Sequence, residues 1–314
     1  MKKNIVAIGG GTGLATLLKG LKDYGLNISA IVTMTDDGMS SGRLRKTFNV
    51  LPPGDIRKTI VALAEKEDLV KSLFEYRFRR GKGLAGHSLG NLLIIALEKI
   101  TGSFSQAIAS ASEILKTKGK VIPSTYNNAN IISTHKSGKI IKGERKAFNR
   151  GLVDPIISIK LDNNSIKANP EAIDAIKNAH VILIGPGSLW TSIIPNLLIQ
   201  EITQAVVNNK LAQKIYICNV STERGETQGY SVTNHVETLI KHSHKNIINF
   251  VLVNNKAKRT TKKFAKLGEV HNIITDLDRI NSYKIINKNI ISEQNPLFHD
   301  SKKLAKVIWE IINE

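Results

Sequence analysis

The sequence predicts an α/β protein: a Rossmann-like, doubly wound, mostly parallel sheet with a small β-hairpin-containing insertion. Short apolar runs alternate with helical patterns, and glycine-rich or polar loops follow several of the runs, as βαβ units require. At 314 residues and 41% hydrophobic content, the chain can bury a large core. We therefore expect one Rossmann-like domain over residues 1–314.

The first half opens with a βαβ pattern. NIVAI (4–8) is a short apolar strand candidate that runs into glycines, and ISAIVTM (28–34) reads as a second buried strand about one crossover later. Between them a helix is predicted because leucines recur on one helical face, at Leu14, Leu17, Leu18 and Leu21.

The second half repeats this pattern. Strands are predicted at 180–184, 214–220 and 249–253, each followed by a polar loop and a helix. Because parallel strands end at one edge of a sheet, the loops after all five strands should face one crevice. These loops carry the sequences GGGTG, TDDG, GPGS, NVSTERGET and NNKAKR.

The middle of the chain does not show the alternation of strands and helices. Residues 55–80 and 86–116 are expected to be helical. An excursion from the main domain is expected at about 120–162, with a hairpin that turns at Ser137-Gly138.

Composition excludes several classes of partner. The net charge is +19, but aromatic residues make up only 5%, so few stacking platforms exist and no nucleic-acid partner is expected. We interpret the basic stretches at 77–82 and 256–266 as solvated faces. No apolar run approaches the roughly 18 to 20 residues that span a bilayer, so no membrane insertion is expected. Cys218 is the single cysteine, and the cytoplasm is the expected location.

The first glycine loop is the clearest candidate for binding an anion. Backbone N–H groups of Gly10, Gly11, Thr12 and Gly13 can approach a phosphate at the start of the following helix. The spacing fits neither a standard dinucleotide fingerprint nor a Walker P-loop. A tight strand-to-helix turn without a ligand remains the alternative.

Asp36 and Asp37 follow the second predicted strand, where an acid binds ribose hydroxyls in dinucleotide folds. Either carboxylate would also suit magnesium shared with a phosphate, although no metal site is assigned with confidence. The alternative is a plain Asp-Gly turn before a helix capped by Ser40 or Ser41.

Two further segments have competing interpretations. Asp55 is interpreted as the N-cap of a helix that follows a proline turn, in preference to a chemical role. His87 and Asn91 stand one helical turn apart and could read a base or a sugar hydroxyl. Equally, His87 could form a hydrogen bond with unpaired backbone groups at the end of its helix.

A second anion-ready loop contains Gly187 and Ser188. A long polar loop further on brings Asn219, Thr222 and Glu226, which favours binding over simple connection. Cys218 is interpreted as a buried residue and not a nucleophile. No catalytic motif is present, so the catalytic residues remain unknown and a nucleotide or phosphorylated ligand is better supported than any reaction.

Together the motifs resemble a known family. GGGTG, TMTDDGMSSGRLR, PPGDIRK, GHSLGNL, GPGSLWTSIIPNLL and CNVSTERGETQGYSVTNHV occur in an order similar to the CofD-like family of 2-phospho-L-lactate transferase and bacterial gluconeogenesis factors. The resemblance implies a Rossmann-like fold that binds a nucleoside diphosphate derivative. The last stretch is similar to the gluconeogenesis-factor branch, which implies binding of a UDP-sugar and support of growth and cell shape on non-glycolytic carbon.

Three functions are carried forward. They are a regulatory protein that binds a UDP-sugar such as UDP-N-acetylglucosamine, a transferase that moves a phospholactyl group from a GDP-activated donor, and an NAD-dependent oxidoreductase. The irregular glycine spacing counts against the last, and the lack of an identifiable base favours the first over the second. The sequence leaves the protein partners and the oligomeric state open, a homo-oligomer included.

The chain departs from the family pattern at two places. Met39 stands where glycine is common, and Glu223-Arg224 replace a more usual Gln-Pro. The Met39 side chain could narrow the approach to the phosphates. Glu223 can only accept hydrogen bonds when ionised, which puts an identical choice of ligand in doubt.

Overall fold

The computed structural model describes residues 2–65, 68–256, 273, 275–277, 280 and 282–313. The strands are β1 Asn4–Gly9, β2 Asn27–Val32, β3 Lys120–Pro123, β4 Ile131–His135, β5 Ile140–Lys142, β6 Ile156–Leu161, β7 Val181–Ile184, β8 Gln213–Ile217, β9 Phe250–Asn254 and β10 Lys284–Lys288. The helices are α1 Gly11–Leu21, α2 Met39–Phe48, α3 Pro53–Leu63, α4 Leu69–Glu75, α5 Leu89–Thr101, α6 Phe104–Ile114, α7 Glu144–Gly151, α8 Pro170–Lys177, η1 Leu189–Ile193, α9 Ile194–Leu197, α10 Gln200–Asn208, α11 Val232–Lys241 and α13 Ser301–Asn313.

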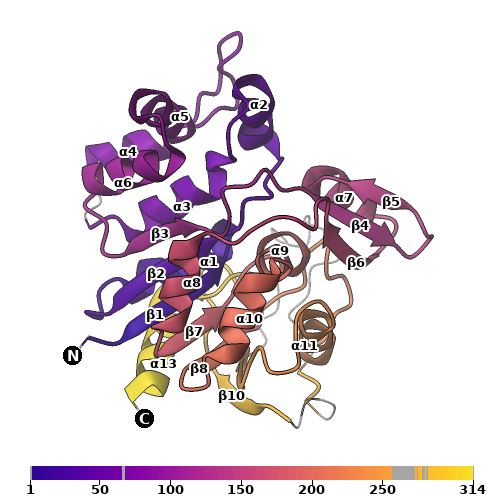
Figure 1. The fold of residues 1–314 in the computed structure, drawn as a ribbon. Coiled ribbons are helices and arrows are strands. Elements are labelled where there is room, and N and C mark those ends of the chain that lie inside the picture. The colour runs from indigo at the N-terminus through magenta and orange to yellow at the C-terminus, as the bar shows by residue number, and fades with distance from the viewer. Residues whose placement is uncertain are drawn as a thin grey trace.

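The main sheet has seven strands in the order β10-β9-β8-β7-β1-β2-β3 (Figure 1). Every neighbouring pair is parallel. The chain builds outward from β1 in one direction through β2 and β3, and later in the other direction from β7 to β10. The predicted α/β fold with a mostly parallel sheet is confirmed, and the order reverses between β1 and β7.

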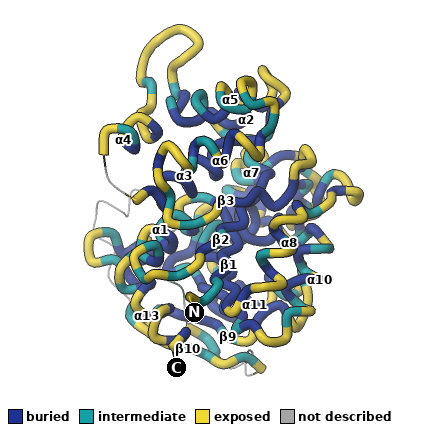
Figure 2. Tube along the Cα trace, turned by 60° about the vertical axis from the view of Figure 1, so that its left-hand side comes forward, coloured by how far each residue is buried: buried dark blue, intermediate teal, exposed yellow. Residues whose placement is uncertain are grey.

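Both faces of the main sheet are covered, which explains why its strands are apolar runs. Along β1, Ile5 and Ala7 pack into one core with α1, α3 and α13. Val6 and Ile8 pack into a second core with α8, α10 and α11. Figure 2 shows the strands buried at the centre, with exposed residues on the outer sides of the helices.

The two long helical segments expected at 55–80 and 86–116 are each broken. The chain leaves the helix at the end of α3, and Asp68 then starts α4 by accepting the N–H of Lys71 at 3.0 Å. Gly102, with φ of +73°, ends α5, and Ser103 caps α6. Glycine tolerates this left-handed conformation, and the cap residues restart each helix in a new direction.

A separate antiparallel sheet has the order β5-β4-β6. The predicted hairpin is confirmed: β4 pairs with β5, and Gly138, with φ of +83°, lies in its turn. The excursion was expected to begin near residue 120, but β3 pairs with β2 in the main sheet. The separate sheet and α7 therefore occupy the part of the chain from β4 to β6, beside the end of the main sheet (Figure 1).

Candidate functional site

Two glycine-rich loops meet where the strand order reverses. Residues 10–13 follow β1 and residues 185–188 follow β7, its neighbour in the sheet. A Cβ on Gly13 would lie 2.5 Å from the carbonyl oxygen of Pro186 and 2.7 Å from the Cα of Gly187. Only glycine at position 13 lets the loops approach so closely. In doubly wound folds, ligands bind in the crevice beside this reversal.

Asp55 closes the first loop from a neighbouring helix. The N–H of Gly11 donates to Asp55 Oδ2 at 2.9 Å, and Lys58 Nζ lies 3.0 Å from Asp55 Oδ1. The interpretation of Asp55 as an N-cap is wrong, because α3 begins at Pro53 with Pro52 in the cap position. Proline suits the first helical turn, so the helix starts two residues earlier. Asp55 therefore lies inside α3 and holds the loop after β1.

Asp36 lies beside Asp55. Its Oδ1 accepts the N–H of Gly38 at 2.9 Å, and a Cβ on Gly54 would lie 2.6 Å from Asp36 Oδ2. Burial, and then the charge of Asp55, raise the pKa of Asp36 against smaller opposing effects that include a hydrogen bond from Ser41. The two carboxylates repel one another, and a cation between them would relieve that repulsion.

Asp37 has a structural partner. Its Oδ1 accepts the N–H of Arg145 at 2.9 Å in the first turn of α7. Its other oxygen approaches Gly143 so closely that a Cβ there would not fit. Asp37 thus caps α7 and fastens the three-stranded sheet beside the crevice, while contact between Asp37 and a ligand stays a prediction.

The start of α2 differs from the expected cap. Gly38 occupies the N-cap position without a side-chain bond, so the alternative in which Ser40 or Ser41 caps this helix is wrong. Met39 follows with φ of +37°, a conformation that favours glycine. Both serines are buried and their hydroxyls turn to other partners, Ser41 to Asp36 and Ser40 to the network described next.

His87 and Asn91 belong to a buried network that joins α2, α3 and α5. Ser40 Oγ lies 3.0 Å from His87 Nδ1 and accepts a hydrogen bond from Asn91 Nδ2 at 3.1 Å. Arg57 Nε donates to Asn91 Oδ1 at 3.0 Å. Burial, and then two nearby arginines, lower the pKa of His87, which is neutral at pH 7. Both side chains therefore hold helices together, and contact with a ligand remains a prediction for them.

The second loop is held by side chains from the loop after β8. Asn219 Oδ1 accepts the N–H of Gly187 at 3.2 Å, and its Nδ2 donates to the Gly187 carbonyl at 2.9 Å. Ser188 Oγ donates to Glu223 Oε1 at 2.6 Å. Asn219 thus fixes the backbone of the loop, and Ser188 already has an acceptor.

Glu226 binds the start of the helix after this loop. Its Oε2 accepts the N–H of Trp190 at 3.1 Å, and its Oε1 accepts the hydroxyl of Thr191 at 2.6 Å. Burial, and then the charge of Glu223, raise its pKa well above the ordinary value. Thr222 is buried in the same loop. The donors of the second glycine loop are therefore bound within the chain, the Gly187 N–H by the Asn219 amide and the Ser188 hydroxyl by the Glu223 carboxylate.

Glu144 adds a further carboxylate. It is half-buried at the first position of α7. Burial raises its pKa well above the ordinary value, and so do four surrounding carboxylates, those of Asp36, Asp55, Glu226 and Asp37. Lys58 and Arg45 bring positive charge into the same region. The surroundings of the glycine loops are thus rich in carboxylates, and a diphosphate bound there would need a cation beside it.

The donor set suits a cation that is shared with a ligand. Within the described ranges, no group of three or more Asp, Glu, His or Cys side chains forms a ready metal cage. Magnesium commonly binds through one or two carboxylates and completes its octahedron with phosphate oxygens and water. The pair formed by Asp36 and Asp55 fits that requirement.

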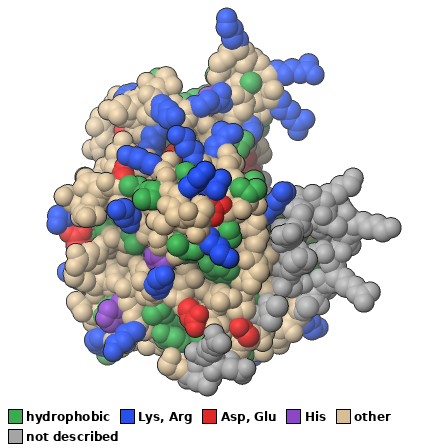
Figure 3. Space-filling view, turned by 90° about the vertical axis from the view of Figure 1, so that its right-hand side faces the viewer, with side chains coloured by type: hydrophobic (Ala, Val, Ile, Leu, Met, Phe, Trp, Pro, Cys, Tyr) green, Lys and Arg blue, Asp and Glu red, His purple; other side chains and the backbone are tan. Residues whose placement is uncertain are grey.

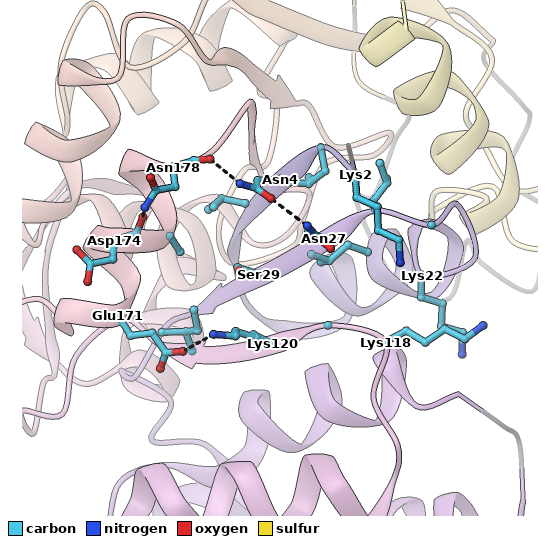
Figure 4. A pocket seen from close by; sticks show the side chains of 18 of the residues that line it. Lys2, Asn4, Lys22, Asn27, Ser29, Lys118, Lys120, Glu171, Asp174 and Asn178 are labelled. Atoms are coloured by element: carbon cyan, nitrogen blue, oxygen red, sulfur yellow. Dashed lines mark hydrogen bonds and ion pairs between the residues drawn. The ribbon is translucent and has the colours of Figure 1, made fainter.

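A cavity lies at the opposite end of the strands. A cavity of about 940 Å³ is lined by the first residues of β1, β2 and β3, namely Asn4, Asn27 and Lys120 (Figure 4). Its charged side chains largely pair with one another, as in Lys118 with Asp23 at 3.0 Å and Lys120 with Glu171 at 3.5 Å. The glycine loops are absent from its lining, so size alone does not identify the site.

Comparison with known proteins gives the family. The family described as 2-phospho-L-lactate transferase CofD matches residues 5–294. The gluconeogenesis factor of Halalkalibacterium halodurans is 40% identical over 314 residues, which cover 98% of this chain and 96% of the relative. That of Bacillus subtilis is 38% identical over 317 residues, covering 100% and 99%.

The chain belongs to the CofD-like family, among the bacterial gluconeogenesis factors. A crystal structure of a protein from Bacillus halodurans superposes with a TM-score of 0.94 at 39% identity and covers 100% of both chains. The fold of this CofD-like chain is therefore that of a solved relative.

The structure joins most of the predicted residues of this CofD-like protein into one region. The loops at 10–13 and 185–188 touch, and Asp36, Asn219 and Glu226 surround them. The sequence did not point to Lys58, Glu144 or Ser192, and it suggested a cap in place of the observed role of Asp55. Ser192 Oγ would lie 3.4 Å from a Cβ on Gly11. A run of small and acidic residues at helix starts, as in PPGD and KGE, is the only local signal for such positions.

The basic stretch at 77–82 lies on an exposed projection between α4 and α5. The projection is held by hydrogen bonds from Phe78 N to His87 O at 3.0 Å and from Gly86 N to Phe78 O at 2.7 Å. Figure 3 shows lysine and arginine side chains at this top end of the molecule. The other basic stretches, 254–259 and 256–266, lie outside the described residues beyond Lys256.

Two remaining expectations concern Cys218 and membranes. Cys218 is buried directly after β8, and burial raises the pKa of its thiol, which keeps it protonated at pH 7. Among the described residues, no helix has the length and apolar character needed to cross a bilayer.

Proposed function

We propose that this gluconeogenesis factor binds a nucleoside-diphosphate sugar, such as UDP-N-acetylglucosamine, at the carboxyl edge of the main sheet. The observation that carries the proposal is the close approach of the two glycine loops at the reversal of strand order. Backbone N–H groups in a loop of this kind can reach a diphosphate without obstruction by side chains. Several polar side chains converge beside the loops, as ligand sites require.

The diphosphate would lie against Thr12 and Gly13, which remain partly exposed, beside the Gly11 N–H that Asp55 already binds. Lys58, already paired with Asp55, would turn its ammonium group toward the phosphates. Asp36 and Asp55 would hold magnesium together with phosphate oxygens, and the ion would neutralise charge on the diphosphate. Asp37 and Glu144 would line the side of the crevice formed by α7.

The names of the relatives support a proposal for the cellular role. Proteins of this length and about 40% identity are named gluconeogenesis factors. We propose that this chain senses a cytoplasmic UDP-sugar and supports growth and cell shape on gluconeogenic carbon. Such a protein releases its ligand unchanged.

One observation favours a transferase as the second candidate. Glu144 has a pKa raised well above the ordinary value and lies among the acids beside the loops. A carboxylate with a raised pKa can accept a proton from an acceptor hydroxyl near neutral pH. Transfer of a phospholactyl group from a GDP-activated donor would use it in that way: the acceptor hydroxyl forms the new bond to phosphorus, the P–O–P bond breaks, and guanosine monophosphate leaves.

Calorimetric titration of the full chain separates these candidates. UDP-N-acetylglucosamine, GDP and NAD are titrated under matched conditions, with and without magnesium. We expect UDP-N-acetylglucosamine to bind most tightly, with affinity lowered when magnesium is removed, and to be recovered intact. Binding of GDP alone would favour the transferase, and binding of none of the three would reject the crevice as a nucleotide site.

A further inference from the structure

Glu223, from the loop after β8, accepts the Ser188 hydroxyl of the second glycine loop, a donor that a phosphate bound there would otherwise use. Its Oε1 accepts the hydroxyl of Ser188 at 2.6 Å, while Glu226 takes the N–H of Trp190 and the hydroxyl of Thr191. The backbone N–H of Gly187 is bound by Asn219. The polar donors around this loop are therefore directed to acceptors within the chain.

Glu223 differs from Glu226 in its access to the crevice. Glu226 is 4% exposed, whereas Glu223 and Ser188 are both half-buried. Only one oxygen of Glu223 is used by Ser188, so the second can accept a hydrogen bond from a bound molecule. Through its bond to Ser188, the Glu223 carboxylate lies next to Gly187, where an added Cβ would be 3.2 Å from the carbonyl oxygen of Gly10 in the first loop.

We propose that Glu223 determines how the ligand is oriented and which ligands are accepted. Its carboxylate keeps a phosphate away from the second loop and accepts a hydrogen bond from an uncharged, hydroxyl-bearing group, the sugar of a nucleoside-diphosphate sugar. The phosphates then lie on the side of the first loop, near Lys58. This inference rests on the proposed function and adds a preference for nucleotides that carry a second sugar on the diphosphate over those that do not.

Free UDP provides the contrast. Its terminal phosphate carries close to two negative charges near pH 7, whereas each phosphate of a UDP-sugar carries one. A fixed carboxylate repels the terminal phosphate of UDP more strongly, and UDP lacks the second sugar, attached to the diphosphate, whose hydroxyl Glu223 would bind. The wild-type protein should therefore prefer UDP-N-acetylglucosamine to UDP.

The test measures the dissociation constants of UDP-N-acetylglucosamine and of UDP, with magnesium, for the full-length protein and three variants. Glu223→Gln removes the charge and keeps an acceptor oxygen, and Glu223→Asp keeps the charge on a shorter side chain. Glu171→Gln makes the same change of net charge at the opposite edge of the sheet, where Glu171 is exposed. Thermal unfolding of each variant verifies that it is folded.

We expect Glu223→Gln to lower the preference for UDP-N-acetylglucosamine over UDP by about tenfold, mainly through tighter binding of UDP. Glu223→Asp and Glu171→Gln should keep the wild-type preference. If Glu223 had only a structural role, Glu223→Gln would weaken the binding of both ligands equally and leave the ratio of their dissociation constants unchanged. That result would overturn the inference while the proposed function stands. If the wild-type protein binds neither nucleotide, the proposed function itself falls.

Discussion

At the scale of single residues, neighbouring carboxylates have different structural roles. Asp36 and Asp37 are adjacent in the sequence and look equivalent there. In the structure Asp36 lies beside Asp55, whereas Asp37 caps α7 through the N–H of Arg145. Substitution of Asp36 should therefore affect mainly ligand binding, and substitution of Asp37 mainly stability.

The first prediction uses that separation. Asp36→Asn should weaken binding of UDP-N-acetylglucosamine with magnesium by about tenfold or more, because a carboxylate that we propose to hold the cation is lost. Unfolding should change little, since an amide oxygen can still accept the N–H of Gly38. Asp37→Ala should instead lower the free energy of unfolding by about 1 kcal/mol through loss of a helix cap. Calorimetry and urea unfolding measure both, and equal effects on stability would contradict the assignment.

Met39 offers a second prediction at this scale. Its φ of +37° suits glycine, and its side chain is 65% exposed, so little packing is lost on its removal. Met39→Gly should raise the free energy of unfolding by up to about 1 kcal/mol, because relief of backbone strain exceeds the entropy cost of glycine. Met39→Ala is the control, since it keeps the Cβ and should bring no gain. Urea unfolding that shows Met39→Gly to be less stable than Met39→Ala would refute this.

At the scale of elements, the contact between the loops after β1 and β7 decides the site. These loops are more than 170 positions apart in sequence, residues 10–13 against 185–188. Their approach depends on a missing side chain at Gly13, and Asn196 adds a hydrogen bond of 3.2 Å to the carbonyl of Gly9. Gly13 in α1 and Asn196 in α9 thereby keep the loops after β1 and β7 in contact.

Gly13→Ala tests this contact. The new methyl group would meet Pro186 and Gly187 backbone atoms at 2.5 to 2.7 Å, so the loops must separate. We expect a loss of about 1 to 3 kcal/mol in stability and loss of measurable nucleotide binding. Gly9→Ala is the matched control, because its added carbon would meet only ordinary contacts of 3.7 Å and longer. If both variants bind equally well, the loop contact does not form the site.

At the scale of the whole molecule, the buried side chain of His299 makes the free energy of unfolding depend on pH. His299 Nε2 donates to the carbonyl of Cys218 at 3.1 Å, and burial lowers the pKa of His299 to about 4. The unfolded chain takes up this proton near pH 6.5, so the stabilisation is complete above pH 6.5 and is lost as the pH falls toward 4. The loop before α13 is thereby sensitive to acid.

His299→Gln can still donate to the Cys218 carbonyl but cannot titrate. Between pH 7 and pH 5, the parent should lose about 2 kcal/mol more of unfolding free energy than the variant. Urea unfolding at the two pH values gives this difference, in which the opposing contributions of the acidic crevice cancel. Identical pH dependence in parent and variant would show that His299 does not bind the proton.

Much of the fold could be predicted because its signals are local. The helix of α1 follows from its leucine spacing, and the β4–β5 hairpin follows from Ser137-Gly138. Boundaries were less accurate: a single glycine at 102 or a cap at Asp68 divides helices whose apolar pattern continues across the break. Asp55 was placed wrongly because a proline turn fits both a cap at Asp55 and a helix that begins at Pro53.

By itself, the sequence determined the alternation of strands and helices, the loops that would share one edge, and the family resemblance. Those properties depend on residue type and spacing along the chain. Only the tertiary structure decided which donors are already bound: Gly11 by Asp55, Ser188 by Glu223, and Trp190 by Glu226. Such pairings join residues that are 35 to 44 positions apart. They depend on how strands order themselves in the sheet, which no local pattern encodes.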